Sequence, residues 1–364
     1  MILLYVFGAV TLINCAYYIL FSKFSFLKPS KKTATEEHSI SLIVCAKNEA
    51  ENLQRHIPLW LSQKYSNFEI ILINDASSDE TLEVMEQFSE QDSRIQIVNV
   101  RNNEAFWGNK KYALTLGIKR AKNNRLIFTD ADCYPASEAW IATMAPNFSD
   151  EKQLILGYGA YEKQPGFLNK LIRFETLMTA VQYFSYAQAG TPYMGVGRNL
   201  GYTSTLFYEK NGFMSHMKVA SGDDDLFVNE AATSKNTAIC IAPEAFTYSL
   251  PKKKREKWVR QKRRHYTTAK LYKPLHRTLL GLYYISNLLF WVLSAIVMFT
   301  QFWAYGLGIV AIRFIFQYIV IGKAARKLKE KDLVFFIPFY ELFLILMQLS
   351  IFISNSDEKN SQWK

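Results

Sequence analysis

The chain has 364 residues and can hold one large hydrophobic core or two small ones, and its 49% hydrophobic, 15% aromatic composition exceeds that of an average soluble domain. The net charge of +11 is assigned mainly to Lys and Arg beside membrane segments rather than to a nucleic-acid surface. The four cysteines form no CxxC pair and the five histidines lack zinc-like spacing, which argues against a disulfide scaffold and a structural metal.

The first apolar segment, Met1 to Phe21, contains no charged residue and is long enough to cross a bilayer. Lys23, Lys28, Lys31 and Lys32 follow it, whereas the positive region of a secretory signal peptide precedes its apolar stretch. No small-residue cleavage pattern follows either. We therefore predict an uncleaved membrane anchor over residues 1–21.

Residues 39–250 alternate short β-branched runs with longer amphipathic ones, which is typical of a mostly parallel sheet covered by helices. The predicted strands are Ser41–Cys45, Phe68–Ile73, Ile95–Val100, Leu126–Thr129 and Leu154–Gly159. The predicted helices are Glu51–Leu61, Thr81–Ser89, Lys110–Ala121 and Glu138–Asn147. The pattern predicts an α/β domain whose strands all end at one edge.

Polar residues occupy the loops at this edge, in the segments Lys47–Glu49, Asn74–Asp79, Gly108–Lys110 and Asp130–Asp132. Converging strand ends can form a nucleotide site without a glycine-rich phosphate loop, and no dinucleotide or Walker pattern occurs. Ser77 to Asp79 fit a turn and N-cap role better than a ligand role, because a helix is predicted from Thr81. Asp75 fits either role.

The acidic pair Asp130 and Asp132 follows directly after the apolar run Leu126–Thr129. Mg²⁺ and Mn²⁺ prefer oxygen ligands, commonly one or two carboxylates plus substrate phosphates. The pair therefore predicts a divalent cation that holds a diphosphate. The alternative is an ordinary turn, since Asp is also a common turn former at strand ends.

A second acidic run, Asp223-Asp224-Asp225, precedes an amphipathic helix. Adjacent carboxylates repel one another, so such a run either caps a helix N-terminus or is held for chemistry. Both roles are compatible here, because Leu226 and Phe227 give the helix an apolar face and leave a carboxylate free to act as a general base.

Two further helices are expected near a membrane surface. Phe167 to Phe184 carries apolar residues at helical spacing and fits either an interface helix that reaches a lipid-borne acceptor or a plain core helix. Residues 251–278 form a basic segment in which Lys254, Trp258 and His265 lie near one helical stripe together with Gln261. Most other Lys and Arg of this segment fit a plain membrane-surface helix.

Three apolar stretches close the chain, Leu279–Phe302, Trp303–Ile321 and Leu333–Ile353, and a polar tail follows over residues 354–364. Basic residues precede the first stretch and lie between the second and third, whereas the connection near residues 301–305 has no charge. By the positive-inside rule, Ser22–Thr278 and Gly322–Asp332 are predicted to be cytoplasmic and both termini to face the other side.

Arg313 and Glu341 are ionisable residues inside predicted spans, where charges are costly and usually paired. At about 1.5 Å per residue their sequence distances from Lys323 and Asp332 place them at nearly equal depth. We predict an ion pair that fixes the packing of the last two helices. A pathway for a polymer or a lipid phosphate is the alternative.

Together these elements resemble the family 2 inverting glycosyltransferases, particularly the membrane-embedded branch with cellulose, chitin and hyaluronan synthases. The resemblance covers roughly Ser39 to Ile321. Its motifs are Val44–Glu49 (VCAKNE), Ile73–Asp79 (INDASSD), Lys110 with Ala113-Leu114, Asp130–Asp132 (DAD), Gly222–Asp224 (GDD) and Gln261–His265 (QKRRH). It implies a GT-A fold, a Rossmann-like nucleotide-diphospho-sugar transferase domain, between N- and C-terminal transmembrane helices.

The resemblance also implies residue roles for a UDP- or GDP-linked sugar and a Mg²⁺ or Mn²⁺ ion. Asp132 would coordinate the metal, and Asp224 would be the catalytic base. The substrate-binding residues would be Ala46, Asn48, Glu49 and Asp75 at the nucleobase, Lys110 and Asp130 at the nucleotide, Arg198 near donor sugar and acceptor, Asp223, and Gln261 and Arg264. A shift of one residue in the acidic run would reassign the base.

Gln261 and Arg264 match the family's QxxRW signature, but His265 stands where the Trp belongs. In polymerising members that Trp lines the acceptor site, so its replacement weakens the case for processive synthesis and leaves single transfer to a lipid-linked or polysaccharide acceptor equally open. A non-catalytic membrane scaffold that keeps the fold is the alternative outside the enzyme class. Binding of nucleic acid is not expected, because the basic run adjoins a span. The expected location is the plasma (inner) membrane, with a cytoplasmic catalytic domain that serves synthesis of an envelope polysaccharide or glycolipid.

Overall fold

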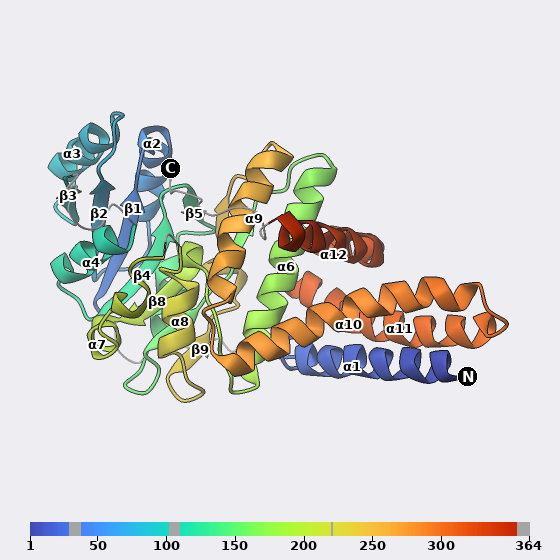
Figure 1. Cartoon of the computed structure of the whole chain (residues 1–364). Coiled ribbons are helices and arrows are strands. Elements are labelled where there is room, and N and C mark those ends of the chain that lie inside the picture. Colours follow the sequence, from blue (N-terminus) through green and yellow to red (C-terminus); the bar gives the residue numbers. More distant parts are fainter. Residues whose placement is uncertain (29–37, 102–109, 220, 355–364) are drawn as a thin grey trace. The chain divides into compact units, whose positions relative to one another are not determined.

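The computed structural model describes residues 1–28, 38–101, 110–219 and 221–354, and the chain divides into two compact units. The helical unit consists of Met1–Lys28, Lys163–Ala189 and, of the described residues, 252–354. The α/β unit consists of the segment that ends at Glu162 and of Gly190–Pro251. Figure 1 labels the helices and strands of both units.

The α/β unit is built on a seven-stranded sheet with the strand order β3-β2-β1-β4-β8-β6-β9. Strands β1 to β4 are mutually parallel where they pair, whereas β8 runs antiparallel to both β4 and β6. The bounds are β1 Ile40–Ala46, β2 Phe68–Asp75, β3 Ile95–Val100, β4 Arg125–Asp130, β6 Leu154–Leu156, β8 Leu200–Thr203 and β9 Thr237–Ile239. The four predicted parallel strands are confirmed, and their polar ends lie at one edge.

Helices cover both faces of this sheet, because successive side chains of a buried strand point to opposite sides. From β1, Leu42 and Val44 join a core cluster with Leu53 and Trp60 of α2. On the other face of the sheet α4 packs so closely that a Cβ at its Gly117 would lie 2.2 Å from a side-chain carbon of Ile73 in β2. The helices are α2 Ala50–Leu61, α3 Thr81–Gln91, α4 Lys110–Arg120, α5 Trp140–Met144, α7 Ser204–Glu209 and α8 Asp225–Ala231.

The predicted strand Leu154–Gly159 is wrong in one respect, since the structure divides it between two sheets. β6 ends at Leu156, and β7 (Gly159–Tyr161) belongs to a three-stranded sheet with β5 (Cys133–Pro135) and β10 (Thr247–Ser249). The chain turns at Gly157, whose N–H donates to the Asn199 carbonyl, and a Cβ there would lie 2.6 Å from the side chain of Asn199. The predicted helix Glu138–Asn147 is likewise shorter, with α5 followed by a 3₁₀ turn.

Within the described residues, the helical unit contains four helical segments that are long and apolar enough to cross a membrane. They are α1 Ile2–Ser25, α10 Pro274–Met298, α11 Trp303–Lys327 and Lys331–Ile353, where a 3₁₀ turn leads into α12 Ile337–Ser354. Each contains or overlaps one predicted apolar stretch. α1, α10 and α11 lie side by side (Figure 1). The remaining helices are α6 Phe167–Gln188 and α9 Arg255–Ala269.

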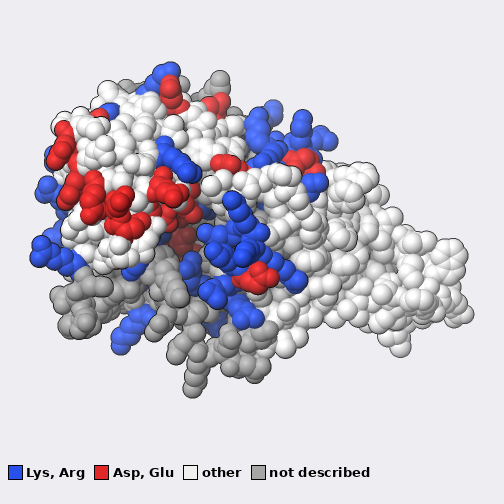
Figure 2. Space-filling view, turned by 90° about the horizontal axis from the view of Figure 1, so that it is seen from above, with Lys and Arg blue, Asp and Glu red and all other residues white. Residues whose placement is uncertain are grey.

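Charged side chains of the helical unit are unevenly distributed. Figure 2 shows one end of the unit as a surface without Lys, Arg, Asp or Glu, whereas Lys and Arg gather where α9 lies. Below that surface Lys262 of α9 pairs with Glu175 of α6 at 2.5 Å, and Arg173 of α6 pairs with Glu330 after α11. The ion pairs therefore join α6 to the middle of α9 and to the segment that follows α11.

The predicted pair of Arg313 and Glu341 is confirmed. Arg313 of α11 is fully buried, and its Nη2 donates to Glu341 of α12 at 2.8 Å. The remaining guanidinium donors reach Asn14 of α1 at 3.2 Å, Asn287 of α10 at 2.6 Å and Gln317 at 2.9 Å. One cation thus contacts a polar group from every candidate span.

We predict that Arg313→Met lowers the free energy of unfolding by about 3–5 kcal/mol, because Glu341 is then left buried without its cation. The double variant Arg313→Met/Glu341→Met should recover part of this loss. Thermal unfolding in detergent measures both, with Arg326→Met, an exposed arginine of the same helix, as the control. Additive losses in the double variant would contradict a coupled pair.

Candidate active site

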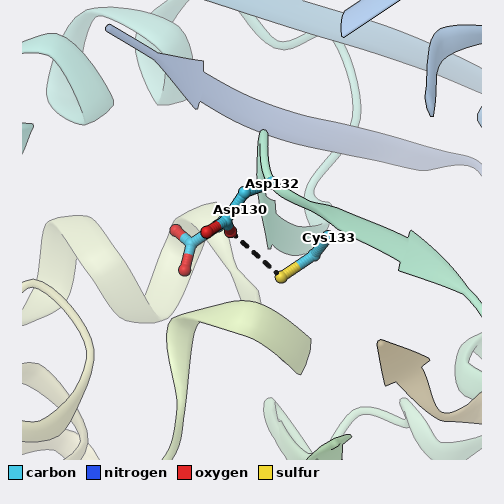
Figure 3. A group of neighbouring side chains, drawn as sticks. All are labelled: Asp130, Asp132 and Cys133. Carbon is cyan, nitrogen blue, oxygen red and sulfur yellow. Dashed lines mark hydrogen bonds between the residues drawn. The ribbon is translucent and has the colours of Figure 1, made fainter. Parts of the chain in front are cut away.

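Two carboxylates stand at the end of β4. Asp130 is its last residue, and Asp132 lies just before β5. Figure 3 shows both carboxylates with the thiol of Cys133, whose Sγ donates to Asp132 Oδ1 at 3.5 Å. The buried run that includes Leu126 and Ile127 fixes the strand in the core, so the acids begin where the apolar residues end.

Lys110 connects the end of β4 with the second acidic run. Its Nζ lies 2.7 Å from Asp130 Oδ1 and 3.0 Å from Asp223 Oδ2. Burial opposes the ammonium charge, but the two carboxylates outweigh it and hold the pKa of Lys110 well above its ordinary value. Burial likewise opposes the charge of Asp223, yet Lys110 lowers the pKa of that carboxyl. The start of α4, the end of β4 and the residues before α8 therefore meet at one ammonium group.

Asp224 is the N-cap residue of α8 and has surroundings unlike those of its neighbours. Its Oδ2 accepts the N–H of Gly197 at 2.7 Å, and its Oδ1 accepts the N–H of Asp225, also at 2.7 Å. Burial raises the pKa of Asp224 to about 7, and the charges of Asp223 and Asp225 add to the rise. Helix capping and a carboxyl that titrates near neutrality thus occur in the same residue.

The loops after β1 and β2 hold each other in place. Asn48, at a positive φ of 57°, accepts the N–H of Ser78 at 2.8 Å and donates its own N–H to Ser77 Oγ at 3.0 Å. The N-cap residue of α3 is Glu80, and within the predicted Ser77 to Asp79 segment it is Asp79 whose Oδ1 accepts the N–H of Thr81 at 3.1 Å. These bonds fix two of the loops that border the strand ends.

Asp75 ends β2 and is 5% exposed. Its Oδ2 has no hydrogen-bond partner among the described residues. Burial raises the pKa of Asp75, against the opposing effect of Lys47 and Lys110. Nearby, Ala46 is buried at the end of β1 and Glu49 is the N-cap residue of α2. A buried carboxylate oxygen without a partner is suited to accept an N–H of a ligand.

Arg198 is held against the small sheet. Its guanidinium lies 4.3 Å from the ring centroid of Tyr161 and donates to the Ala160 carbonyl at 3.1 Å and to Ser249 Oγ at 3.2 Å. Gly159 makes room for it, because a Cβ there would lie 2.8 Å from Arg198 Cβ. The preceding residue donates to Asp224, so this segment links the small sheet with the acidic run.

A small cavity lies among these groups. Polar side chains line one part of it, and apolar side chains from β1, β4, β8 and α4 line the rest. The lining residues are Ile43, Cys45, Lys110, Leu114, Phe128, Thr129, Asp130, Gly197, Leu200, Tyr202, Asp223 and Asp224. The structure therefore brings Lys110, Asp130, Asp223 and Asp224 together around one hollow.

The atoms at the end of β4 fit a hard divalent cation through oxygen. Ligand atoms of Asp130, Asp132 and Cys133 all lie within 4.8 Å of one another. Burial, with Asp132 beside it, raises the pKa of the Cys133 thiol, which therefore stays protonated and is a poor ligand for Mg²⁺ or Mn²⁺. Asp130 is already bonded to Lys110, which leaves Asp132 as the carboxylate best placed for a metal.

The predicted substrate-binding residues Gln261 and Arg264 lie on α9, which belongs to the helical unit and not to the α/β unit. Both are partly buried, and Gln261 Oε1 has no hydrogen-bond partner among the described residues. Of the predicted stripe, Trp258 is buried and Gln261 partly buried, whereas Lys254 and His265 are exposed. The predicted loop residues 108 and 109 lie outside the described residues.

Sequence reasoning missed two residues that contact the acidic segments. His56 of α2 is buried, with Nδ1 2.9 Å from the carbonyl oxygen of Ala131, between the two acids of the DAD motif. Lys111 is 2% exposed and lies on the face of α4 that also buries Leu114 and Ile118. A lysine at an apolar position of the helical period is the signal that could have identified it.

We predict that the unfolding temperature of the protein falls between pH 5.5 and pH 8 and falls less in Asp224→Asn. The folded-state pKa of Asp224, about 7, exceeds its ordinary value of 3.8, so the native state binds more protons than the unfolded chain between these values. The free energy of unfolding therefore decreases as the pH rises toward 7. Unfolding scans across this range test it, and equal slopes in the two proteins would contradict the raised pKa.

The model of the family described as "Glycosyl transferase family 2" matches residues 41–209. An uncharacterized glycosyltransferase of Haemophilus influenzae is 31% identical over 134 residues, 35% of this chain and 40% of that protein. Poly-beta-1,6-N-acetyl-D-glucosamine synthase of Staphylococcus aureus is 29% identical over 165 residues, 45% of this chain and 37% of the synthase. The chain thus spans well under two thirds of the length of these relatives.

Among solved structures, the mannosyltransferase PcManGT of Pyrobaculum calidifontis, in complex with GDP-Man and Mn²⁺, is similar to 92% of this chain and 99% of its own. The TM-score is 0.58 at 16% sequence identity, so the likeness concerns the fold. The predicted GT-A fold with N- and C-terminal apolar helices is confirmed. Residues 41–209 therefore match glycosyl transferase family 2, and the order of the motifs and the α/β sheet agree with that match.

Proposed function

We propose that the protein is a membrane glycosyltransferase that moves a sugar from a nucleoside-diphosphate sugar to an acceptor hydroxyl, with inversion at the anomeric carbon. The observation that carries this proposal is the meeting of Lys110, Asp130 and Asp223 beside Asp224, at the edge where the parallel strands end. Open α/β sheets bind their ligands at this edge.

The donor would lie along the ends of β1, β2 and β4. The unpartnered oxygen of Asp75 would accept an N–H of the nucleobase, and the loop of Ala46, Asn48 and Glu49 would border it. Lys110 would lie near the diphosphate with Asp130. A divalent cation such as Mg²⁺ or Mn²⁺, held by Asp132, would supply charge neutralisation on the leaving diphosphate.

Asp224 would act as the general base. Its carboxylate, oriented by the N–H groups of Gly197 and Asp225, takes the proton of the acceptor hydroxyl. The hydroxyl oxygen then bonds to the anomeric carbon as the bond to the diphosphate oxygen breaks on the opposite face. A pKa of about 7 suits this step, because a base works best when its pKa lies near the operating pH.

The acceptor is proposed to be lipid-linked or a polysaccharide, and the donor a UDP- or GDP-linked sugar. The GDP-Man complex of PcManGT and the polysaccharide product of the staphylococcal synthase support these classes. His265 in place of the signature Trp favours single transfer over processive synthesis. Arg198 follows Gly197, whose N–H donates to Asp224, and would contact the donor sugar or the acceptor. Gln261 and Arg264 would contact the acceptor.

The apolar helices α1, α10, α11 and α12 are proposed to cross the plasma (inner) membrane. The α/β unit, with the domain bounds 39–250 that the sequence predicts, would then lie in the cytoplasm. We predict that alkaline phosphatase fused after Phe302 is active, whereas the same fusion after Lys329 is inactive, because that enzyme matures only outside the cytoplasm. Equal activities of the two fusions would contradict this orientation.

The transfer itself is tested by nucleoside-diphosphate release from a panel of UDP- and GDP-sugars by the detergent-purified protein, with lipid extract as acceptor. We predict release from one donor that needs Mn²⁺ or Mg²⁺ and is abolished by EDTA. Asp132→Ala and Asp224→Asn should each reduce kcat by at least about 100-fold, since each removes a group that acts in the transition state.

Lys119→Met, an exposed lysine of α4, is the matched control and should keep full activity. No release from any donor would favour a non-catalytic scaffold that retains the fold. Metal-independent release would overturn the role of Asp132 while leaving the transferase in place.

A further inference from the structure

We propose that Lys111 is a positioning residue that holds the segment before Asp223 and Asp224, and so sets the place of the general base. This inference rests on the proposed function, because it assigns Lys111 to the site in which Asp224 acts. Its neighbour Lys110 binds carboxylate side chains, whereas Lys111 binds main-chain atoms, so the two lysines hold the same segment in different ways.

The contacts of Lys111 are short and reach a part of the chain more than a hundred residues away. Its Nζ donates to the carbonyl oxygen of Val219 at 2.5 Å and to that of Ser221 at 2.7 Å. Ser221 lies two residues before Asp223 and three before Asp224 in the sequence. The ammonium group therefore fixes the main chain immediately before the acidic run.

The main chain needs such support at this point. Gly222 has a φ of +99°, where a side chain is disfavoured, and a Cβ at this residue would lie 2.4 Å from Leu226. α8 begins only at Asp225 and extends to Ala231, so the helix itself orders little of the preceding turn. The bonds from α4 supply the order that a glycine turn and a short helix lack.

A burial argument separates this role from that of an ordinary core side chain. Lys111 is 2% exposed, and taking an ammonium group out of water is costly unless it is hydrogen-bonded or paired. A leucine or methionine at this position of α4 would avoid that cost and still fill the apolar face. The site holds a lysine instead: burial lowers the pKa of Lys111, and the negative charges of Asp223, Asp225 and Asp224 oppose that fall.

The positive charge of Lys111 also bears on the titration of Asp224. The groups that act on this carboxyl are Asp223 and Asp225 from the same run, Lys110 and Lys111 from α4, and the N–H of Gly197. Loss of one of the two cations should raise the pKa of Asp224. A variant without the charge therefore needs a higher pH to form the base.

The test compares Lys111→Met with the wild-type chain, and uses Lys111→Arg and Lys119→Met as matched controls. Hydrogen exchange of the peptide that spans residues 217–226 should be at least about tenfold faster in Lys111→Met and unchanged in Lys119→Met. In donor turnover, kcat should fall about 100-fold with little change in KM, as expected for a displaced catalytic group. The acid limb of the pH profile should move to higher pH, and Lys111→Arg should keep the wild-type limb.

Each outcome decides the proposal. Wild-type exchange and an unmoved pH limb in Lys111→Met would overturn it, as would a uniform loss of activity without a shift of the limb. If Lys111→Met does not fold, Lys111→Gln, which removes the charge and keeps a neutral N–H donor, still tests the shift of the pH limb. If the wild-type chain turns over no donor, the proposed function fails, and hydrogen exchange still decides whether Lys111 orders the segment.

Discussion

The α/β unit depends on the neutralisation of negative charge at the edge where its strands end. Asp130 follows a buried strand, Asp223 comes from a segment nearly a hundred residues later, and these carboxylates would repel each other without a cation between them. Lys110 supplies that cation at 2.7 Å and 3.0 Å. The two ion pairs of Lys110 couple the parallel half of the sheet to the segment before α8. They also place Asp224 in one cavity with Asp223, which is itself paired with Lys110.

Much of this arrangement could be predicted from the sequence. The parallel strands β1 to β4 are long, rich in β-branched residues and bounded by polar loops, so local pattern and tertiary structure agree. Asp75 and Asp130 could be placed at strand ends for the same reason, because each stands at the end of a largely apolar run. Their roles in binding and catalysis stay predictions.

Other parts could not be predicted because their order comes from distant contacts. β8 has four residues with Gly201 among them, and it is a strand because it pairs with β4 and β6 on either side. The division of residues 154–161 between two sheets depends on the buried side chain of Asn199, which bonds to the carbonyls of Tyr158 and Ala245. Lys111 could be suspected only from its place on the apolar face of α4, because the carbonyls of Val219 and Ser221 that it contacts belong to a distant part of the chain.

The network around Arg313 has a consequence for biogenesis. A ribosome makes α1 with Asn14 and α10 with Asn287 before it makes Arg313, and Glu341 comes last. On the proposed topology the guanidinium therefore enters the bilayer ahead of its counter-ion, at a time when the amide oxygens of Asn14 and Asn287 are already present to accept its N–H groups. Hydrogen bonds from Arg313 to those amides would lower the cost of inserting its charge before Glu341 is made. The order of the spans along the chain, and not only their final packing, therefore bears on how a buried arginine can be inserted.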